Sequence, residues 1–341
     1  MRLAHVREHH AAAGTPWRLA AALDADNATW LDLEIARRRA NAANRNLEHD
    51  SILHRQPVTT LDDHLMRGMR VAVLEELLDG FEPREDDDAV VDAADVAFGP
   101  PILQPPSIRD FYAFERHVAT TWGRRGQPIP EAWYRLPVFY FSNVSELRGP
   151  GAPVWAPRGS DELDYELEVG LLIDTPARDL SAARGEEAIG GYLVLNDWSA
   201  RDLQRDETSV RLGPVKGKDF ATSIGPWLAT PDELSDRREP GSTAPDVQMT
   251  ASVTTHDGRT IETSRGSWAT VHHSLGAMVE RASADVRLRP GEILGTGTVV
   301  GGCLLEIRDE TLGRYLESGD VVSLEVERLG RLVTPIVERP D

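Results

Sequence analysis

The pattern that decides the fold lies in the stretch DYELEVGLLI, residues 164–173. Successive side chains of a β-strand point to opposite faces, so the apolar residues at 165, 167, 169, 171 and 173 share one face. Glu166 and Glu168 then project together from the other face. A strand this apolar favours burial of the glutamate pair, and buried like charges require a compensating cation. The alternative is a pair exposed to water on an open sheet face, where most glutamates lie.

A third carboxylate follows the next apolar segment, which runs from residue 191 into Asn196-Asp197-Trp198. Functional residues often lie where a strand passes into a loop, which makes Asp197 a candidate ligand. Asp197 could equally cap the helical turn predicted over 201–205, in which Arg201 and Gln204 share a face. Carboxylate oxygens are typical ligands of Mg²⁺, Mn²⁺ or Ca²⁺ rather than Zn²⁺. The sequence therefore predicts a site for a hard divalent cation.

Outward from this strand, residues 107–341 consist of short apolar segments separated by Gly, Pro and Asp. The predicted strands are 138–141, 165–173, 191–195, 248–254 and 321–326, and the predicted helices are 109–122, 201–205 and 274–284. Strands that follow one another without intervening helices argue against a parallel dinucleotide-binding sheet. The predicted fold class is α+β and mainly β.

The first hundred residues have a different pattern. Strands are predicted over 17–23 and 28–33, and one amphipathic helix over 61–81, with Thr60 as its N-cap and an end near Gly80. The proline-rich segment 99–106 disfavours helix and marks a boundary. We therefore predict an N-terminal domain at 1–105 and a second domain at 106–341.

The composition excludes several classes of protein. A net charge of -19 and a pI near 5.0 argue against a nucleic-acid partner, because binding to phosphates needs a basic surface. Cys303 is the one cysteine, so an intramolecular disulfide and a cysteine-rich metal site are both excluded. No uninterrupted apolar run approaches the roughly 18 residues that a membrane span requires. We expect a cytoplasmic protein with no membrane partner.

Only two of the 37 basic residues are lysines, Lys216 and Lys218, and they lie together in PVKGKD. A GC-rich genome explains the bias toward arginine. It does not explain why these two lysines remain. A lysine is a compact charge that can approach an oxyanion in a way that arginine cannot.

Two further segments carry candidate residues. In RDFYAFERH, residues 109–117, His117 lies seven positions after Asp110, although a lone histidine is more often structural than catalytic. The glycine-rich segment 295–302 fails the GxGxxG pattern and has no Walker lysine, so a nucleotide site is not indicated. We expect its backbone amides and the Thr298 hydroxyl to approach a small anionic ligand.

Six segments in this order resemble the fumarylacetoacetate hydrolase family: RDFYAFERH, LDYELEVGLLI, NDWSARDLQ, LGPVKGKDF, LRPGEILGTGT and CLLEI. The resemblance extends from about residue 107 to the C-terminus, roughly two thirds of the chain. It implies a catalytic domain folded as a mixed β-roll or β-sandwich, preceded by a smaller N-terminal α/β domain. It also implies a homodimer and a divalent cation, with Mg²⁺ favoured over Mn²⁺ or Ca²⁺.

The resemblance implies roles for twelve residues. The metal ligands would be Asp110, Glu166, Glu168 and Asp197. The dyad that activates water would be His117, oriented by Glu306. The groups that stabilise the oxyanion and the carbanion leaving group would be Arg201, Gln204 and Lys218. The substrate contacts would be Tyr112, Tyr140 and Thr298.

These roles imply hydrolysis of a carbon–carbon bond in a small 1,3-dicarbonyl oxo-acid, such as an acylpyruvate or a fumarylacetoacetate-like diketo acid. The same metal-enolate chemistry also serves decarboxylases, hydratases and tautomerases, but hydrolysis needs a base that reaches water. His117 with Glu306 therefore favours hydrolysis. A non-catalytic binding protein with this fold is the alternative of another class. After Tyr140 the residues at 141–143 are Phe-Ser-Asn where fumarylacetoacetase has His-Gly-Arg, which leaves the substrate open.

Overall fold

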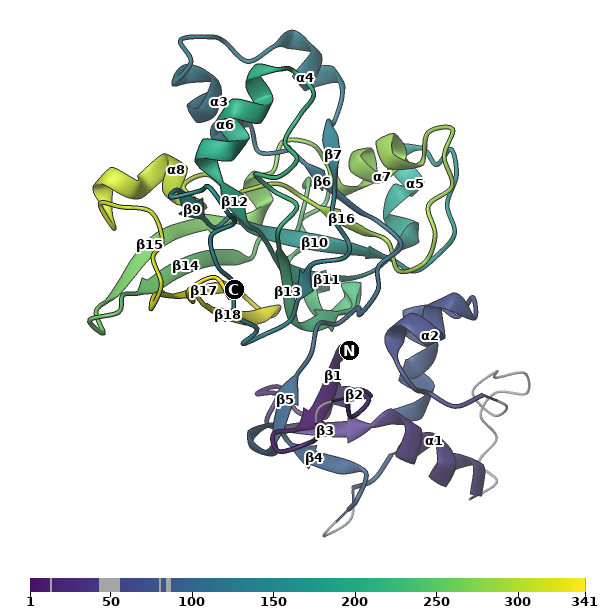
Figure 1. Cartoon of the computed structure of the whole chain (residues 1–341). Coiled ribbons are helices and arrows are strands. Elements are labelled where there is room, and N and C mark those ends of the chain that lie inside the picture. The colour runs from purple at the N-terminus through teal and green to yellow at the C-terminus, as the bar shows by residue number, and fades with distance from the viewer. Residues whose placement is uncertain (13, 43–55, 80, 84–86, 341) are drawn as a thin grey trace.

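The computed structural model describes residues 1–12, 14–42, 56–79, 81–83 and 87–340 (Figure 1). Its strands are β1 (Arg2–Glu8), β2 (Arg18–Ala22), β3 (Thr29–Asp32), β4 (Val90–Asp92), β5 (Val96–Phe98), β6 (Ile108–Phe111), β7 (Phe139–Ser142), β8 (Leu147–Arg148), β9 (Leu163–Asp164), β10 (Leu167–Ile173), β11 (Ile189–Asp197), β12 (Ser199–Ala200), β13 (Thr222–Ala229), β14 (Gln248–Thr254), β15 (Thr260–Ser267), β16 (Ile293–Gly295), β17 (Val321–Val326) and β18 (Gly330–Pro335). The α-helices are α1 (Leu33–Ala42), α2 (Leu61–Met66), α3 (Glu115–Gly123), α4 (Glu131–Arg135), α5 (Ala182–Gly185), α6 (Arg201–Ser209), α7 (Leu275–Ser283) and α8 (Leu304–Ile307). The 3₁₀ helices are η2 (Val71–Leu77), η3 (Ala93–Asp95), η4 (Glu186–Ala188), η5 (Pro231–Arg237), η6 (Trp268–Thr270) and η7 (Arg308–Glu310).

The strands form one large mixed sheet, a smaller four-stranded sheet and a two-stranded sheet of β9 and β12. The main path of the large sheet runs β4-β3-β2-β1-β13-β11-β10-β16-β6-β7, and the small sheet runs β15-β14-β17-β18. Most neighbours are antiparallel, whereas β6 pairs parallel with β16 and β8 with β13. This sheet-dominated α+β architecture confirms the predicted fold class.

The strand β10 has the alternation that the sequence predicts. Its residues at 167, 169, 171 and 173 join a core that also contains the inner residues of β14 and β17. Leu172 points the other way, into a second core shared with α1, α2 and η2. Both faces of β10 are buried, and so are Glu166 and Glu168. The exposed alternative for the glutamate pair is therefore wrong.

The N-terminal elements extend the large sheet. β1 pairs with β13, with Leu3 opposite Leu228, and the second core joins side chains from both sides of residue 105. Figure 1 shows these purple elements below β10, β11 and β16. The division into domains at 105 stays a prediction.

Two of the predicted helices are wrong in part. The helix predicted over 61–81 begins as expected, with Thr60 accepting from the Asp63 amide at 3.2 Å. It stops at Met66, because Gly68 takes a left-handed conformation with φ +79°, and the chain resumes as η2. The predicted end near Gly80 lies outside the described residues.

The helix predicted over 109–122 is a strand over its first residues. Ile108–Phe111 forms β6, between β16 and β7, and the helix α3 starts only at Glu115. The four residues of β6 are all buried, so pairing with two neighbouring strands overrides the local helical pattern. This change matters for the site, because it places Asp110 in the sheet directly opposite Gly295.

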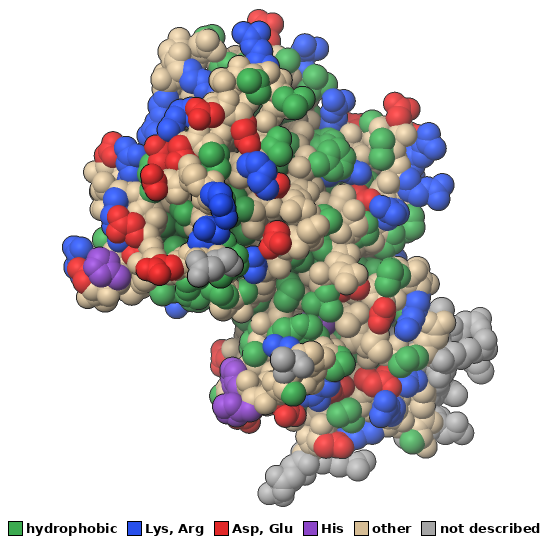
Figure 2. Space-filling view, in the orientation of Figure 1, with side chains coloured by type: hydrophobic (Ala, Val, Ile, Leu, Met, Phe, Trp, Pro, Cys, Tyr) green, Lys and Arg blue, Asp and Glu red, His purple; other side chains and the backbone are tan. Residues whose placement is uncertain are grey.

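Charged side chains of both signs are interspersed over the face seen in Figure 2, without a continuous basic patch on that face. Within the described ranges, no helix has the length and apolar character needed to cross a membrane.

Candidate active site

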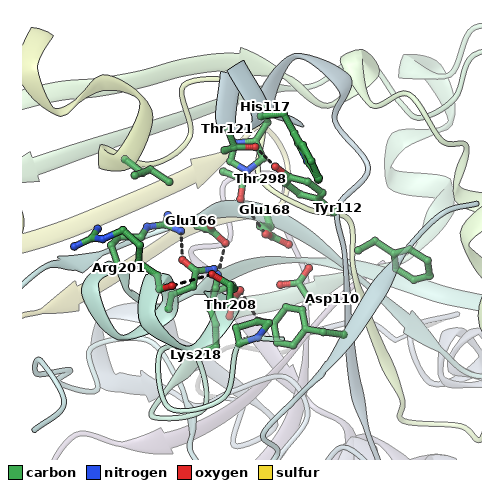
Figure 3. Close-up of a pocket in the computed structure, with 18 of the residues that line it drawn as sticks. Asp110, Tyr112, His117, Thr121, Glu166, Glu168, Arg201, Thr208, Lys218 and Thr298 are labelled. Carbon is green, nitrogen blue, oxygen red and sulfur yellow. Dashed lines mark hydrogen bonds and ion pairs between the residues drawn. The ribbon is translucent and has the colours of Figure 1, made fainter. Parts of the chain in front are cut away.

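A pocket of about 500 Å³ lies where β6, β10 and β11 meet α3 and α6 (Figure 3). Eleven of the twelve predicted site residues line it, and the twelfth, Glu306, contacts His117. Segments as distant in sequence as β6 and the loop before α8 contribute side chains to this one space. Among the described residues, none before Asp110 lines the pocket.

Three carboxylates gather at the base of the pocket. Oxygens of Asp110, Glu168 and Asp197 lie within 4.8 Å of one another, and all three side chains are buried. Gly295 makes room for them, because a Cβ at this position would lie 2.6 Å from Asp110 Oδ1 and 3.0 Å from Glu168 Oε2. Glycine at 295 thus allows two acidic groups to approach each other.

This cluster is suited to a hard cation. Oδ1 of Asp110 and Oδ1 of Asp197 are buried and have no hydrogen-bond partner among the described residues. An unpartnered buried carboxylate oxygen is costly, and an ion held by several oxygens removes that cost. The donors are all carboxylate oxygens, which Mg²⁺, Mn²⁺ and Ca²⁺ accept.

The electrostatics of the cluster favour the binding of a positive charge. Burial, together with the carboxylates of Glu168 and Asp197, raises the pKa of Asp110 well above its usual range. Burial, with the charges of Glu166 and Asp197, does the same to the pKa of Glu168. Like charges that are forced together in a low dielectric favour the protonated form. A bound cation would reverse this preference.

Glu166 is held differently from Glu168. Its Oε2 accepts from Lys218 Nζ at 2.6 Å, and its Oε1 forms an ion pair with Arg201 at 2.8 Å. Burial alone would raise the pKa of Glu166, but these two cations outweigh it and lower the pKa. Of the four predicted metal ligands, Glu166 therefore lies beside the three-carboxylate cluster and contacts two cationic side chains.

Lys218 joins Glu166 to the carboxylate cluster, since Nζ also donates to Asp197 Oδ2. Burial alone would lower the pKa of Lys218, but Asp197 and Glu166 raise it. The second lysine is unlike the first. Lys216 is exposed and pairs with Asp219 at 2.8 Å.

Neutral groups fix the orientation of the acids. Tyr140 donates from its hydroxyl to Asp197 Oδ2 at 2.6 Å. The Gly297 amide donates to Glu168 Oε2 at 2.9 Å, and the Thr298 hydroxyl to Glu168 Oε1 at 3.3 Å. Gly297 has φ +85°, and a Cβ there would lie 2.4 Å from the carbonyl oxygen of the residue at 111. The anion that the Gly297 amide and the Thr298 hydroxyl contact is the protein's own Glu168.

The predicted dyad is formed. His117 on α3 is hydrogen-bonded through Nδ1 to Glu306 Oε1, and both side chains are buried. The Gly301 amide donates to Glu306 Oε2 at 2.9 Å, which fixes the second oxygen. Because Nδ1 is engaged, Nε2 is the ring nitrogen available to a water molecule. Figure 3 shows His117 above the acidic residues of the same pocket.

Arg201 connects one side of the pocket to its base. Its Nη1 donates to Gln204 Oε1 at 3.0 Å, its Nη2 pairs with Glu166, and its Nε donates to Asp164 Oδ2 at 2.8 Å. The guanidinium is buried, and its pKa stays well above the usual range because the carboxylates of Asp164 and Glu166 outweigh the effect of burial. Three of the predicted site residues thus form one connected group.

Aromatic and basic side chains also line the pocket. Tyr112 contacts the Thr121 hydroxyl and packs edge-on against the His117 ring, with 5.3 Å between centroids. Burial raises the pKa of Tyr112 to about 12, which keeps its hydroxyl protonated. Arg124 donates to backbone carbonyls of α8, and its neighbour Arg125 also lines the pocket. The residues at 141–143 are not among those that line it.

Sequence reasoning missed Asp164 as a site residue. It lies two positions before Glu166, and alternation along the strand would place it on the same face as the glutamate pair. The sequence predicts that backbone amides of residues 295–302 approach an anion, but it does not predict that the partners of Gly297 and Gly301 are Glu168 and Glu306 of the same chain.

The family is shown by sequence. Residues 107–337 match the model of the fumarylacetoacetate (FAA) hydrolase C-terminal family, which is more than half of the chain. The chain belongs to this family, as the resemblance predicts.

The chain is also similar to individual proteins of known sequence or structure. The chain is 30% identical over 203 residues to 2,4-didehydro-3-deoxy-L-rhamnonate hydrolase of a Sphingomonas species, a match that covers 60% of this chain and 64% of the relative. The match therefore spans less than two thirds of that relative's length. Two solved structures share the fold: fumarylacetoacetate hydrolase of Exiguobacterium antarcticum, with 21% identity and a TM-score of 0.68, and 5-carboxymethyl-2-hydroxymuconate delta-isomerase of Mycobacterium smegmatis, with 24% and 0.62. Each of these two structural matches covers 99% of this chain and 100% of the solved chain.

Proposed function

We propose that this chain is a divalent-cation-dependent hydrolase that cleaves a carbon–carbon bond in a small 1,3-dicarbonyl oxo-acid. The observation that carries the proposal is one pocket that holds both the carboxylate cluster of Asp110, Glu168 and Asp197 and the dyad of His117 with Glu306. A cation site alone would serve several reactions of an enolate. A base that reaches water is what hydrolysis adds.

The cation would be held by Asp110, Glu168 and Asp197, with Glu166 beside them, and Mg²⁺ is the first candidate. When bound, such an ion polarises a chelated 1,3-dicarbonyl and makes its enolate a better leaving group. The unpartnered buried oxygens of Asp110 and Asp197 support this assignment.

His117 is the general base that removes a proton from the attacking water. With Nδ1 bonded to Glu306, the imidazole presents Nε2 to water and removes a proton as the water oxygen bonds to the acyl carbon. Glu306 holds the ring in the required tautomer and stabilises the imidazolium that results. The bond between the acyl carbon and the central carbon then breaks, and its electron pair passes to the departing enolate. The enolate carbon receives the proton from the His117 imidazolium, which returns to its neutral form.

Charge on the substrate is stabilised by Arg201, Gln204 and Lys218. These groups are already ordered by Glu166, Asp164 and Asp197, so little reorganisation is needed as negative charge develops. Tyr112, Tyr140 and Thr298 would contact the substrate. The acidic surface makes such local cations necessary for an anionic substrate, since the chain has a net charge of -19.

A panel assay tests the proposal. Acylpyruvates, fumarylacetoacetate-like diketo acids and oxaloacetate are offered with Mg²⁺ and then with EDTA, and the products are identified. We expect Mg²⁺-dependent cleavage of a diketo acid into two acids. Turnover of oxaloacetate alone would instead support a decarboxylase. No turnover, together with no metal-linked shift in Tm, would support a binding protein.

The homodimer and the cytoplasmic location stay predictions, which sedimentation and cell fractionation can test.

A further inference from the structure

Asp164 is a fully buried carboxylate that no predicted role uses. Its Oδ2 accepts from Arg201 Nε at 2.8 Å and from the Leu305 amide at 2.9 Å. Its Oδ1 accepts from the Leu304 amide at 2.7 Å. One side chain from β9 therefore binds both an arginine of α6 and the first turn of α8.

The two hydrogen bonds to α8 are important because this helix is too short to be stable without tertiary contacts. It is four residues long, a single turn, and its N-cap Cys303 makes no side-chain capping bond. The first amides of a helix have no partner within the helix, and a one-turn helix has little intrinsic stability. Asp164, which lies on the distant strand β9, accepts hydrogen bonds from two of these amides and so caps the helix.

Glu306 lies on this same turn. Its Oε1 meets His117 Nδ1, so a shift of α8 moves the carboxylate away from the imidazole. The bond to Arg201 extends the connection to the other side of the pocket, where the guanidinium also contacts Glu166 and Gln204. A small displacement of a supporting group can cost a large part of a catalytic rate.

We propose that Asp164 is a positioning residue that sets two parts of the site at once, Glu306 against His117 through α8, and Glu166 with Gln204 through Arg201. The roles of these partners rest on the proposed function. Asp164 itself does not line the pocket, and it acts only through the groups that it holds.

The same strand region offers a matched control. Asp174 follows the far end of β10, is also buried, accepts from the Val71 amide at 3.0 Å and pairs with Arg70 at 3.5 Å. It does not line the pocket. Asp164→Asn and Asp174→Asn thus each remove a buried charge that is bonded to an arginine and a backbone amide, but only one of them supports the site.

The test compares these variants in the metal-loaded full chain. For Asp164→Asn we expect kcat to fall about ten-fold or more, with KM for substrate changed far less, as for other supports of site groups. Asp174→Asn should keep kcat within about two-fold even if its Tm falls. Equal effects of the two substitutions on kcat would overturn the proposal, since Asp164 would then be a structural residue only.

A double-mutant cycle tests the route. If Asp164 acts through Glu306, adding Asp164→Asn to Glu306→Gln should cost much less than the same change in the wild type. Full additivity of the two effects would contradict the connection through α8. If Asp164→Asn does not fold, Asp164→Glu keeps the charge but displaces the carboxylate, and it should still lower kcat. A wild-type rate for that variant would count against the proposal.

A spectroscopic readout separates this inference from the proposed function. The His117 Nδ1 proton bonded to Glu306 should give a downfield NMR signal, assigned by its loss in Glu306→Gln. We expect Asp164→Asn to shift or broaden this signal and Asp174→Asn to leave it unchanged. If the wild type cleaves no dicarbonyl, the proposed function fails, whereas an unperturbed signal in Asp164→Asn overturns the positioning role alone.

Discussion

Lys218 Nζ donates to Glu166 Oε2 at 2.6 Å in the base of the pocket, where both side chains are buried. The same ammonium group contacts Asp197. One cation thus compensates two buried acids of a group that contains four.

This relationship predicts that Lys218→Met lowers both the stability and the activity of the protein. Removing one partner of a buried ion pair leaves an uncompensated charge, which lowers the free energy of unfolding by about 3 kcal/mol or more. Activity should be lost as well, because the positive charge near the leaving group is gone. Urea unfolding, followed by circular dichroism, measures the first effect.

The other lysine is the control for this change. Lys216 is exposed and pairs with Asp219 on the surface, so Lys216→Met should change stability by no more than about 0.5 kcal/mol. Similar losses of stability for the two substitutions would mean that Lys218 does not compensate the acids.

The carboxylate cluster predicts that Glu168→Gln weakens Mg²⁺ binding by about ten-fold or more, since a neutral amide replaces a charged ligand. Calorimetric titration with MgCl₂ measures the affinity, and the rise of Tm with Mg²⁺ should shrink in parallel. Glu292→Gln removes a buried carboxylate that pairs with Arg109 at 3.2 Å outside the pocket, and it should bind Mg²⁺ as the wild type does. Wild-type affinity and turnover in Glu168→Gln would refute the metal assignment.

The dyad predicts a split between two reactions. His117→Ala should lower hydrolysis of a diketo acid by about 100-fold or more, because a positioned base contributes that much. Decarboxylation of oxaloacetate needs no attacking water and should change far less. Steady-state rates for both substrates in one enzyme preparation measure the split.

The exposed His256, in the turn after β14, provides the control, and His256→Ala should leave both rates unchanged. A parallel loss of both reactions in His117→Ala would show that the histidine does not serve hydrolysis specifically.

The raised pKa values of Asp110 and Glu168 predict a pH dependence of stability in the metal-free protein. The folded state retains protons that the unfolded chain releases near its usual carboxyl pKa of about 4. Where the folded state binds more protons, stability falls as pH rises. The contribution of these two groups should therefore be favourable below about pH 4 and should fall as pH rises toward their folded pKa values.

The measurement is the difference in the free energy of unfolding between Asp110→Asn and the wild type, since this difference cancels the titrating groups that do not interact with Asp110. The variant should gain stability relative to the wild type as pH rises from about 5 to 8, and saturating Mg²⁺ should abolish this gain. A difference that is constant with pH would contradict the like-charge origin of the effect.

The strands could be predicted from the sequence because their alternation is local. The strands at 248–254 and 321–326 were predicted with the bounds that the structure has, and β10 buries the face that its apolar residues indicate. The beginning of the helix at Thr60 also follows from neighbouring residues. The wrong helix over β6 shows the limit. Its four residues form a strand because β16 and β7 lie on either side, and neither partner is near in sequence.

For the candidate site, too, the sequence determined some features and the tertiary structure decided the others. The sequence by itself determined the kind of chemistry, since two alternating glutamates, an aspartate after a strand and a family pattern indicate a hard cation and a His–Glu dyad. Only the tertiary structure decided that Asp110 joins Glu168 and Asp197 across Gly295, that Glu166 contacts Lys218 and Arg201, and that Asp164 supports α8. The physical reason is that residue type limits which charges and donors are available, whereas burial and partners arise from contacts between segments distant in the sequence, some of them more than a hundred residues apart.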